Sequence, residues 1–301
     1  MKRKLIPQGG SGLTMYLPKK WVDDNGLGQG DEVDVNINED TVIVKTQIKA
    51  KKSEISLDIS SDTESGVRTI LTNAYRIGYD VLHVTYSHKK QLDYIKKTVK
   101  NNLLGFDLLE EESQKCVIEN IAEPSIEKFD VMFDKIFHIT NHLFDITLEN
   151  FNSGSVDLEQ ISSLVIKLQE YDNFCRRAIS KRKLIDKRNQ FYWILFTYLV
   201  QIARHISRLN ESLDKGIKAS NECVKLFEEV HGMFELLRKS YLSKSTKELP
   251  KIHDLEKSLI YEEGYDLLTK SGKDHILIHH IIDIARFVYI ANSPLYGLLL
   301  E

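Results

Sequence analysis

Histidines and carboxylates near the end of the chain have the spacing of a possible metal site. The residues His275, His279, Asp283 and Arg286 recur at intervals of four and three, so on a helix they share one face. Two imidazoles four residues apart can bind one metal ion. The same pattern is typical of the polar outer face of an amphipathic helix. No glutamate completes an HExxH motif here, so the pattern does not indicate a metalloprotease.

A glycine-rich stretch near the N-terminus raises the possibility of a phosphate-binding loop. The segment "LIPQGGSGLTMYLPKKWVDDNGLGQGDEVDV", residues 5–35, is glycine-rich in a chain with 15 glycines. A P-loop requires G-x-x-x-x-G-K-[ST], which is absent. A dinucleotide fingerprint opens a helix after a strand, whereas "GLGQG" closes a predicted helix and precedes a strand. We therefore interpret the glycines as turns of a small β fold.

Basic residues are concentrated at two places in this N-terminal segment. They lie at the chain start and just after Pro18, namely Lys2, Arg3, Lys4, Lys19 and Lys20. A segment of about 45 residues with short strands cannot bury a sufficient core alone. A two-fold dimer would complete that core and place both copies of the basic residues on one face. Such a face could contact DNA, or the lysines could be solvated and the segment could serve only to dimerise.

The composition limits the classes of protein. The chain has 301 residues and a net charge of −3, which allows two or three domains and argues against a uniformly basic protein. Its three cysteines lie far apart and predict neither a disulfide framework nor a zinc site. The most apolar stretch, residues 191–200, is too short to span a bilayer. We expect a soluble, cytoplasmic protein without a cofactor, and the absence of a G-x-S-x-G elbow gives no reason to expect an enzyme.

The hydrophobic periodicity divides the chain into three regions. Residues 2–46 alternate with period two and predict strands near 13–17, 33–37 and 42–44, with a "NED" turn and one helix between Pro18 and Gly26. After a "KAKKS" linker, residues 54–121 predict a mixed unit. Its strands are "EISLDI" and "DVLHVTY", its helices are "TESGVRTILTNAYRIG" and "HKKQLDYIKKTVKNNL", and "FDLLEEE" with "KCVIENI" forms a closing hairpin.

Beyond Pro124 the apolar period is helical to the end of the chain. Three long helices, broken near "NSGS" and "SKRK", precede three shorter ones at roughly 216–241, 250–270 and 273–292. This succession predicts a duplicated three-helix unit. The predicted fold class is multidomain α+β: a β head at 1–48, an α/β middle unit at 54–122 and an all-α region at 124–301, with repeats at about 124–212 and 216–296.

The first region resembles a SpoVT/AbrB-type swapped-hairpin DNA-binding domain. The resemblance rests on the ordered set within "KRKLIPQGGSGLTMYLPKKWVDDNGLGQGDEVDVNINEDTVIVK": a basic first strand, "GGS", "LPKKW" and "GLGQGDEV" before two strands. It implies an intertwined homodimeric β-barrel with Lys2, Arg3, Lys4, Lys19 and Lys20 as DNA contacts. The family commonly places arginines there. Lysine binds phosphate as a point charge, so we expect contacts dominated by the DNA backbone.

The helical region resembles PhoU, the regulator of phosphate uptake, and the whole order resembles an archaeal regulator architecture. The segment "LVQIARHISRLNES" aligns with a metal-binding family motif, with Ser207 and Glu211 at its two ligand positions. In "LVIKLQEYDNF" only Glu170 and Asp172 remain of a second acidic motif. The resemblance thus implies the PhoU architecture with degraded metal ligands.

Three functions follow as hypotheses. The first is a DNA-binding transcriptional regulator of phosphate uptake or homeostasis, whose helical tail relays the signal. The second is a PhoU-type adaptor that binds a phosphate transporter or kinase and uses the head only to dimerise. The third, which we do not favour, is an enzyme that uses the histidine stripe.

Overall fold

The chain is described here by a computed structural model, which covers residues 2–10, 12–38, 41–46, 52–122, 125–181, 187–270 and 272–300. It divides into two compact units, residues 1–52 and 53–301, each described by itself. The central residues of the predicted "NED" turn, most of the "KAKKS" linker, Pro124 and the end of "SKRK" lie outside the described residues.

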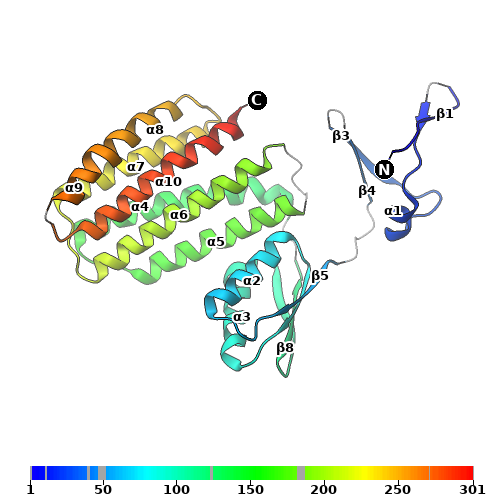
Figure 1. The fold of residues 1–301 in the computed structure, drawn as a ribbon, viewed down its shortest axis with the longest axis horizontal. Coiled ribbons are helices and arrows are strands. Elements are labelled where there is room, and N and C mark those ends of the chain that lie inside the picture. Colours follow the sequence, from blue (N-terminus) through cyan, green and yellow to red (C-terminus); the bar gives the residue numbers. More distant parts are fainter. Residues whose placement is uncertain are drawn as a thin grey trace. The chain divides into compact units, whose positions relative to one another are not determined.

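The N-terminal unit consists of two hairpins and a short helix (Figure 1). Strand β1 (Ile6–Gln8) pairs antiparallel with β2 (Gly12–Thr14), and β3 (Val33–Asn38) pairs antiparallel with β4 (Thr41–Thr46). Helix α1 (Lys19–Asp24) lies between the hairpins in sequence. Within the described part of one chain the strands form two separate sheets and no closed barrel. The strand predicted at 13–17 ends at Thr14, because Met15–Leu17 pair with no described strand of the same chain.

The second unit begins with a four-stranded sheet. Strands β5 (Glu54–Asp58), β6 (Val81–Thr85), β8 (Lys115–Asn120) and β7 (Phe106–Glu112) lie in that order, with β5 and β6 parallel and the other pairs antiparallel. Helix α2 (Glu64–Ile77) makes the parallel crossover, and α3 (Lys89–Asn102) follows β6. Thr63 caps α2 by accepting a hydrogen bond from the Gly66 N–H. Every element predicted between residues 54 and 121 is therefore present.

The rest of the unit is helical. The helices are α4 (Phe129–Ser153), α5 (Leu158–Ser180), α6 (Asn189–Asp214), α7 (Asn221–Leu242), α8 (Leu249–Glu256), α9 (Tyr265–Thr269) and α10 (His275–Leu299). A 3-10 turn (Ile126–Lys128) precedes α4. The predicted breaks between helices are found, whereas the duplication of a three-helix unit stays a prediction from the sequence.

Two of these helices differ from their predicted extents. The helix predicted at 250–270 is α8 and α9 joined by a π-helical segment (Lys257–Gly264), whose wider turn buries the adjacent residues Leu259 and Ile260. The helix predicted to end at Asn292 continues through Pro294 to Leu299. Leu295 and Leu298 are buried there, and this packing outweighs the hydrogen bond that proline removes.

The second unit has a layered arrangement (Figure 1). Helices α2 and α3 pack on the sheet around one apolar cluster, and both also contact α5 of the helical bundle. Helix α10 packs along α6, which forms the most extensive helix pair of the unit. Polar side chains on α2, α5 and α6 consequently meet where the α/β layer joins the bundle. Among the described helices, none is both long enough and apolar enough to cross a membrane.

Candidate functional site

The basic residues predicted to contact DNA all lie on the surface of the N-terminal unit. Lys2, Arg3 and Lys4 precede β1, and Lys19 and Lys20 open α1 directly after Pro18; all five are exposed. Among the described residues none of these side chains forms an ion pair. They are therefore available to a polyanion such as the DNA backbone. A single chain does not bring the two groups together through any described hydrogen bond or ion pair.

The glycines after α1 form a turn, as the sequence predicts. Gly26 and Gly30 adopt φ values of 63° and 92°, which glycine reaches without strain. The Asp31 carboxylate accepts a hydrogen bond of 2.7 Å from the Gly28 N–H. This turn joins the C-terminal end of α1 to β3. Lys19 and Lys20 lie at the opposite, N-terminal end of this short helix.

An uncovered apolar face is the second feature of the N-terminal unit. In the β3–β4 hairpin Val35 pairs with Val44 and Ile37 pairs with Val42, which places these side chains on one face. Ile37 is 78% exposed and Val35 is 56% exposed. Among the residues of 1–52 that the structure describes, none is buried. One copy of this unit thus lacks the core that would hold it folded.

The carboxylates indicated by the PhoU resemblance either pair with basic side chains or lie apart from one another. Glu170 is buried and pairs with Lys167. Asp172 is 1% exposed and lies between Arg76 and Arg176, at 2.9 Å and 2.8 Å. Glu211 lines a cleft between α2 and α6. In the parts of the chain that are described, no group of three or more His, Cys, Asp or Glu side chains is arranged to hold a metal ion.

The structure separates His275 from the other residues of the predicted histidine stripe. Nε2 of His275 contacts the Gly272 N–H and the Lys270 carbonyl, in the loop before α10. His279 and Asp283 do lie together, 3.4 Å apart, and Asp283 also pairs with Arg286.

Their neighbours include two histidines that the sequence pattern did not indicate. His205 and His280 approach within 3.3 Å through their Nδ1 atoms. Burial, reinforced by the neighbouring histidines and Arg208, lowers the pKa of His280 to about 4, and burial also lowers the pKa of His205.

Sequence reasoning also missed a group of arginines at the junction of the α/β layer and the bundle. Arg68 and Arg76 come from α2, and Arg204 and Arg208 come from α6; all four line one cleft. The pair at 204 and 208 offered a signal, because like charges four residues apart on a helix repel each other. Nothing local in the sequence indicates that α2 supplies the opposite wall.

Two short hairpins, glycine turns at Gly9–Gly10 and after α1, surface basic residues and an uncovered apolar face are typical of a small domain that fits a DNA-binding or antitoxin-type regulatory role. Residues 8–55 match a family model described as "Antidote-toxin recognition MazE, bacterial antitoxin". The N-terminal unit is therefore similar to MazE/AbrB-type domains. No curated protein and no solved structure matches the chain. The match ends at residue 55, so the resemblance of the tail to PhoU stays a prediction.

Proposed function

We propose that this protein is a dimeric, DNA-binding transcriptional regulator. The observation that carries the proposal is the N-terminal unit, which exposes Ile37, Val35 and Val42 on one face of a hairpin and has no buried residue among those that the structure describes. A second copy laid on that face would bury it, and interleaved hairpins from two chains would close the swapped barrel that one chain lacks. The match of residues 8–55 to an antitoxin-type family supports the same assembly.

In this proposal the dimer binds DNA through its phosphates. Each copy contributes Lys2, Arg3, Lys4, Lys19 and Lys20, and two-fold symmetry doubles the set. Four of the five are lysines, which act as point charges and do not form the bidentate contacts with guanine that arginine forms. Binding should therefore depend steeply on salt and weakly on sequence.

A role for the second unit is proposed from its helical bundle. Its helical bundle is compatible with the PhoU resemblance seen in the sequence, which makes phosphate uptake or homeostasis the first signal to test. We propose a regulatory role in the cytoplasm and no catalytic one.

The test is DNA binding by the full chain, measured by fluorescence anisotropy with a labelled duplex at low salt. The variant Lys19→Ala/Lys20→Ala should bind at least tenfold more weakly, while Lys215→Ala/Lys218→Ala, which removes two exposed lysines from the second unit, should bind as the wild type does. A dimeric wild-type protein that binds no duplex at low salt would contradict the proposal. The head would then serve only to dimerise, as in a PhoU-type adaptor.

The family description favours one further function, recognition of a toxin protein. Antitoxin-type proteins of this description are named for that recognition, and DNA binding does not exclude it. Co-expression of the chain with its chromosomal neighbours, followed by purification of the complex, separates the two roles. A stable stoichiometric complex with one small neighbour would assign the antitoxin role.

A further inference from the structure

A cleft opens where the α/β layer meets the helical bundle. It has a volume of about 490 Å³ and is lined by residues of α2, α3, α5 and α6. Its charged side chains are Arg68, Arg76, Arg204, Arg208 and one acid, Glu211, which leaves a net charge of +3. The cleft has the size of a small-molecule site, but its walls are polar where such sites are usually apolar. The expected occupant therefore carries negative charge.

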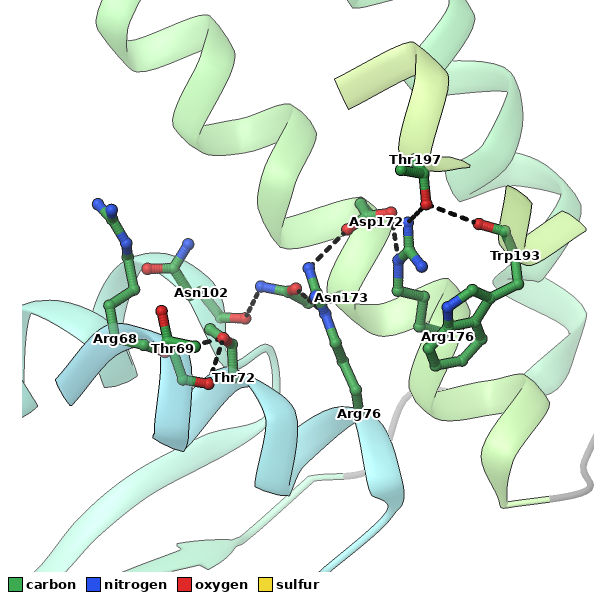
Figure 2. A network of polar contacts seen from close by, with 10 residues as sticks. All are labelled: Arg68, Thr69, Thr72, Arg76, Asn102, Asp172, Asn173, Arg176, Trp193 and Thr197. Atoms are coloured by element: carbon green, nitrogen blue, oxygen red, sulfur yellow. Dashed lines mark hydrogen bonds and ion pairs between the residues drawn. The ribbon is translucent and has the colours of Figure 1, made fainter. Parts of the chain in front are cut away.

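One of the four arginines is fixed in place by the protein. Arg76 extends from α2 to α5, where its Nε donates to Asn173 Oδ1 at 2.8 Å and its Nη2 pairs with Asp172 at 2.9 Å (Figure 2). Asp172 also accepts from Arg176 Nε. One carboxylate thus serves two guanidinium groups, and a positive excess remains at this wall of the cleft.

The other three arginines have no such partner among the described residues. Arg68, Arg204 and Arg208 form no ion pair and no guanidinium hydrogen bond with any residue that the structure describes. Figure 2 shows Arg68 extending away from the contacts of Arg76. Burial and the charges of Arg68 and Arg208 lower the pKa of Arg204, so the protein itself disfavours this charged group. A cluster that is unfavourable without a counter-charge is the arrangement that an anion would stabilise.

We propose that this cleft binds a phosphorylated small molecule, whose phosphate groups lie between Arg68 of α2 and Arg204 and Arg208 of α6. Planar guanidinium groups match phosphate oxygens with paired hydrogen bonds. The hydroxyl groups of Ser65, Thr69 and Ser207 line the same cleft and supply further donors.

The space next to the cleft indicates a ligand larger than a phosphate ion. A second hollow of about 240 Å³ shares Arg68, Asn102 and Ser207 with the first and extends toward α3. Its lining, which combines polar side chains with Val165 and Ile166, can accommodate the body of a phosphate ester. A recessed space of this size does not admit a DNA duplex, so the cleft and the basic head are different sites.

Ligand binding at this place would join the two layers of the second unit. Helix α2 belongs to the α/β layer and α6 to the bundle, so one phosphate group would bridge elements that are more than a hundred residues apart in sequence. A ligand that binds only the docked arrangement stabilises it by mass action. The site therefore has the position of an effector site, and it is independent of whether the head binds DNA.

The test uses the full chain without DNA. Isothermal titration and thermal unfolding are measured with inorganic phosphate, pyrophosphate and ATP, at constant ionic strength set with sodium chloride. We expect at least one of the three to bind and to raise the unfolding temperature. Arg204→Ala, and separately Arg68→Ala from the opposite wall, should bind it at least tenfold more weakly. Arg238→Ala, which removes a partly exposed arginine of α7 outside the cleft, should bind as the wild type does.

If these arginines served only to stabilise the fold, Arg204→Ala would lower the unfolding temperature of the ligand-free protein. The proposal predicts a different result. Without ligand, Arg204→Ala should unfold at the wild-type temperature or above it, because it removes a repelled charge. The proposal is overturned if none of the three compounds binds, or if both cleft variants bind as tightly as the wild type.

Discussion

The guanidinium group of Arg177 on α5 lies 2.7 Å from the carboxylate of Asp80, which precedes β6. Arg177 is 2% exposed, and its Nη1 also donates to the carbonyl oxygens of Tyr75 and Tyr79. Its guanidinium group lies over the rings of Tyr75 and Phe106. One side chain of the bundle thus satisfies the end of α2 and the loop after it, which fixes how the α/β layer meets the bundle.

We expect Arg177→Met to destabilise the second unit by about 3 kcal/mol, because it leaves buried carbonyl groups and a carboxylate without this donor. Methionine retains the apolar contacts of the arginine stem. Urea unfolding followed by circular dichroism measures the change. Arg238→Met is the matched control, since Arg238 pairs with Glu235 at the surface, and should cost less than about 1 kcal/mol. Equal decreases in the free energy of unfolding for the two variants would show that Arg177 contributes no more to stability than a surface arginine.

Asp80 should make the second unit sensitive to strong acid. Burial raises its pKa, but hydrogen bonds from Lys181 and Ser53 prevail and lower it from 3.8 to about 2. A carboxylate with a depressed folded-state pKa contributes stability above pH 4 that is lost as the pH falls toward 2. Its contribution is about 1–2 kcal/mol after allowance for solvent screening. Asp80→Asn should therefore be less stable than wild type at pH 6, and the difference should shrink between pH 4 and pH 2. A pH-independent difference would contradict this assignment.

The lowered pKa of His280 predicts that the stability of the second unit also changes in a second, separate pH range. Its pKa is lowered to about 4, mainly by burial and then by the neighbouring His205. Because the unfolded chain binds the proton more readily, stability is lost as the pH falls from about 6.5 to 4. The loss attributable to this group is about 1–2 kcal/mol after discounting for solvent. His280→Gln should show a flatter stability profile in this window only, measured by urea unfolding at half-unit steps of pH. A profile parallel to that of the wild type would exclude His280 as the cause.

The proposed dimer depends on the apolar face of β3. Ile37→Asp would place a charge in the interface, and the full chain should become monomeric in size-exclusion chromatography with light scattering. Asn36→Asp is the matched control, because neighbouring residues of a strand point to opposite faces. If Ile37→Asp remains dimeric, the two chains associate elsewhere.

The salt dependence of DNA binding tests how many phosphates the lysines contact. Each phosphate contact contributes about 0.9 to the slope of log K against log salt concentration. If Lys19 and Lys20 of both copies contact phosphates, Lys19→Ala/Lys20→Ala should lower that slope by roughly 3 to 4. Anisotropy titrations at four salt concentrations measure it. A weaker complex with an unchanged slope would place these lysines outside the DNA interface.

Much of the secondary structure follows from short stretches of the chain. Helix α2 lies within the helix predicted over "TESGVRTILTNAYRIG", and in the structure Thr63 caps its start and Gly78 ends it in the left-handed conformation. The β3–β4 hairpin is predicted from the alternation of valines with polar residues. Short-range patterns are less informative where a distant element intervenes. Helix α10 continues through Pro294 because Leu295 and Leu298 are buried, and Gly297 lets the ring of Phe191 approach closely, contacts that no local rule contains.

Most of the elements, their order and the basic head with its glycine turns follow from the sequence, because propensity, capping and periodicity act within a few residues. The tertiary structure decided what the polar residues do. Asp172 resembles a metal ligand in its motif, but the packing of α2 against α5 makes it the partner of Arg76, in addition to its neighbour Arg176 on the same helix. The same packing brings Arg68 opposite Arg204 and Arg208. Each arginine alone resembles an ordinary solvated residue of a helix. Only the burial of apolar faces between distant elements, which acts over the whole chain, places the three in one cleft.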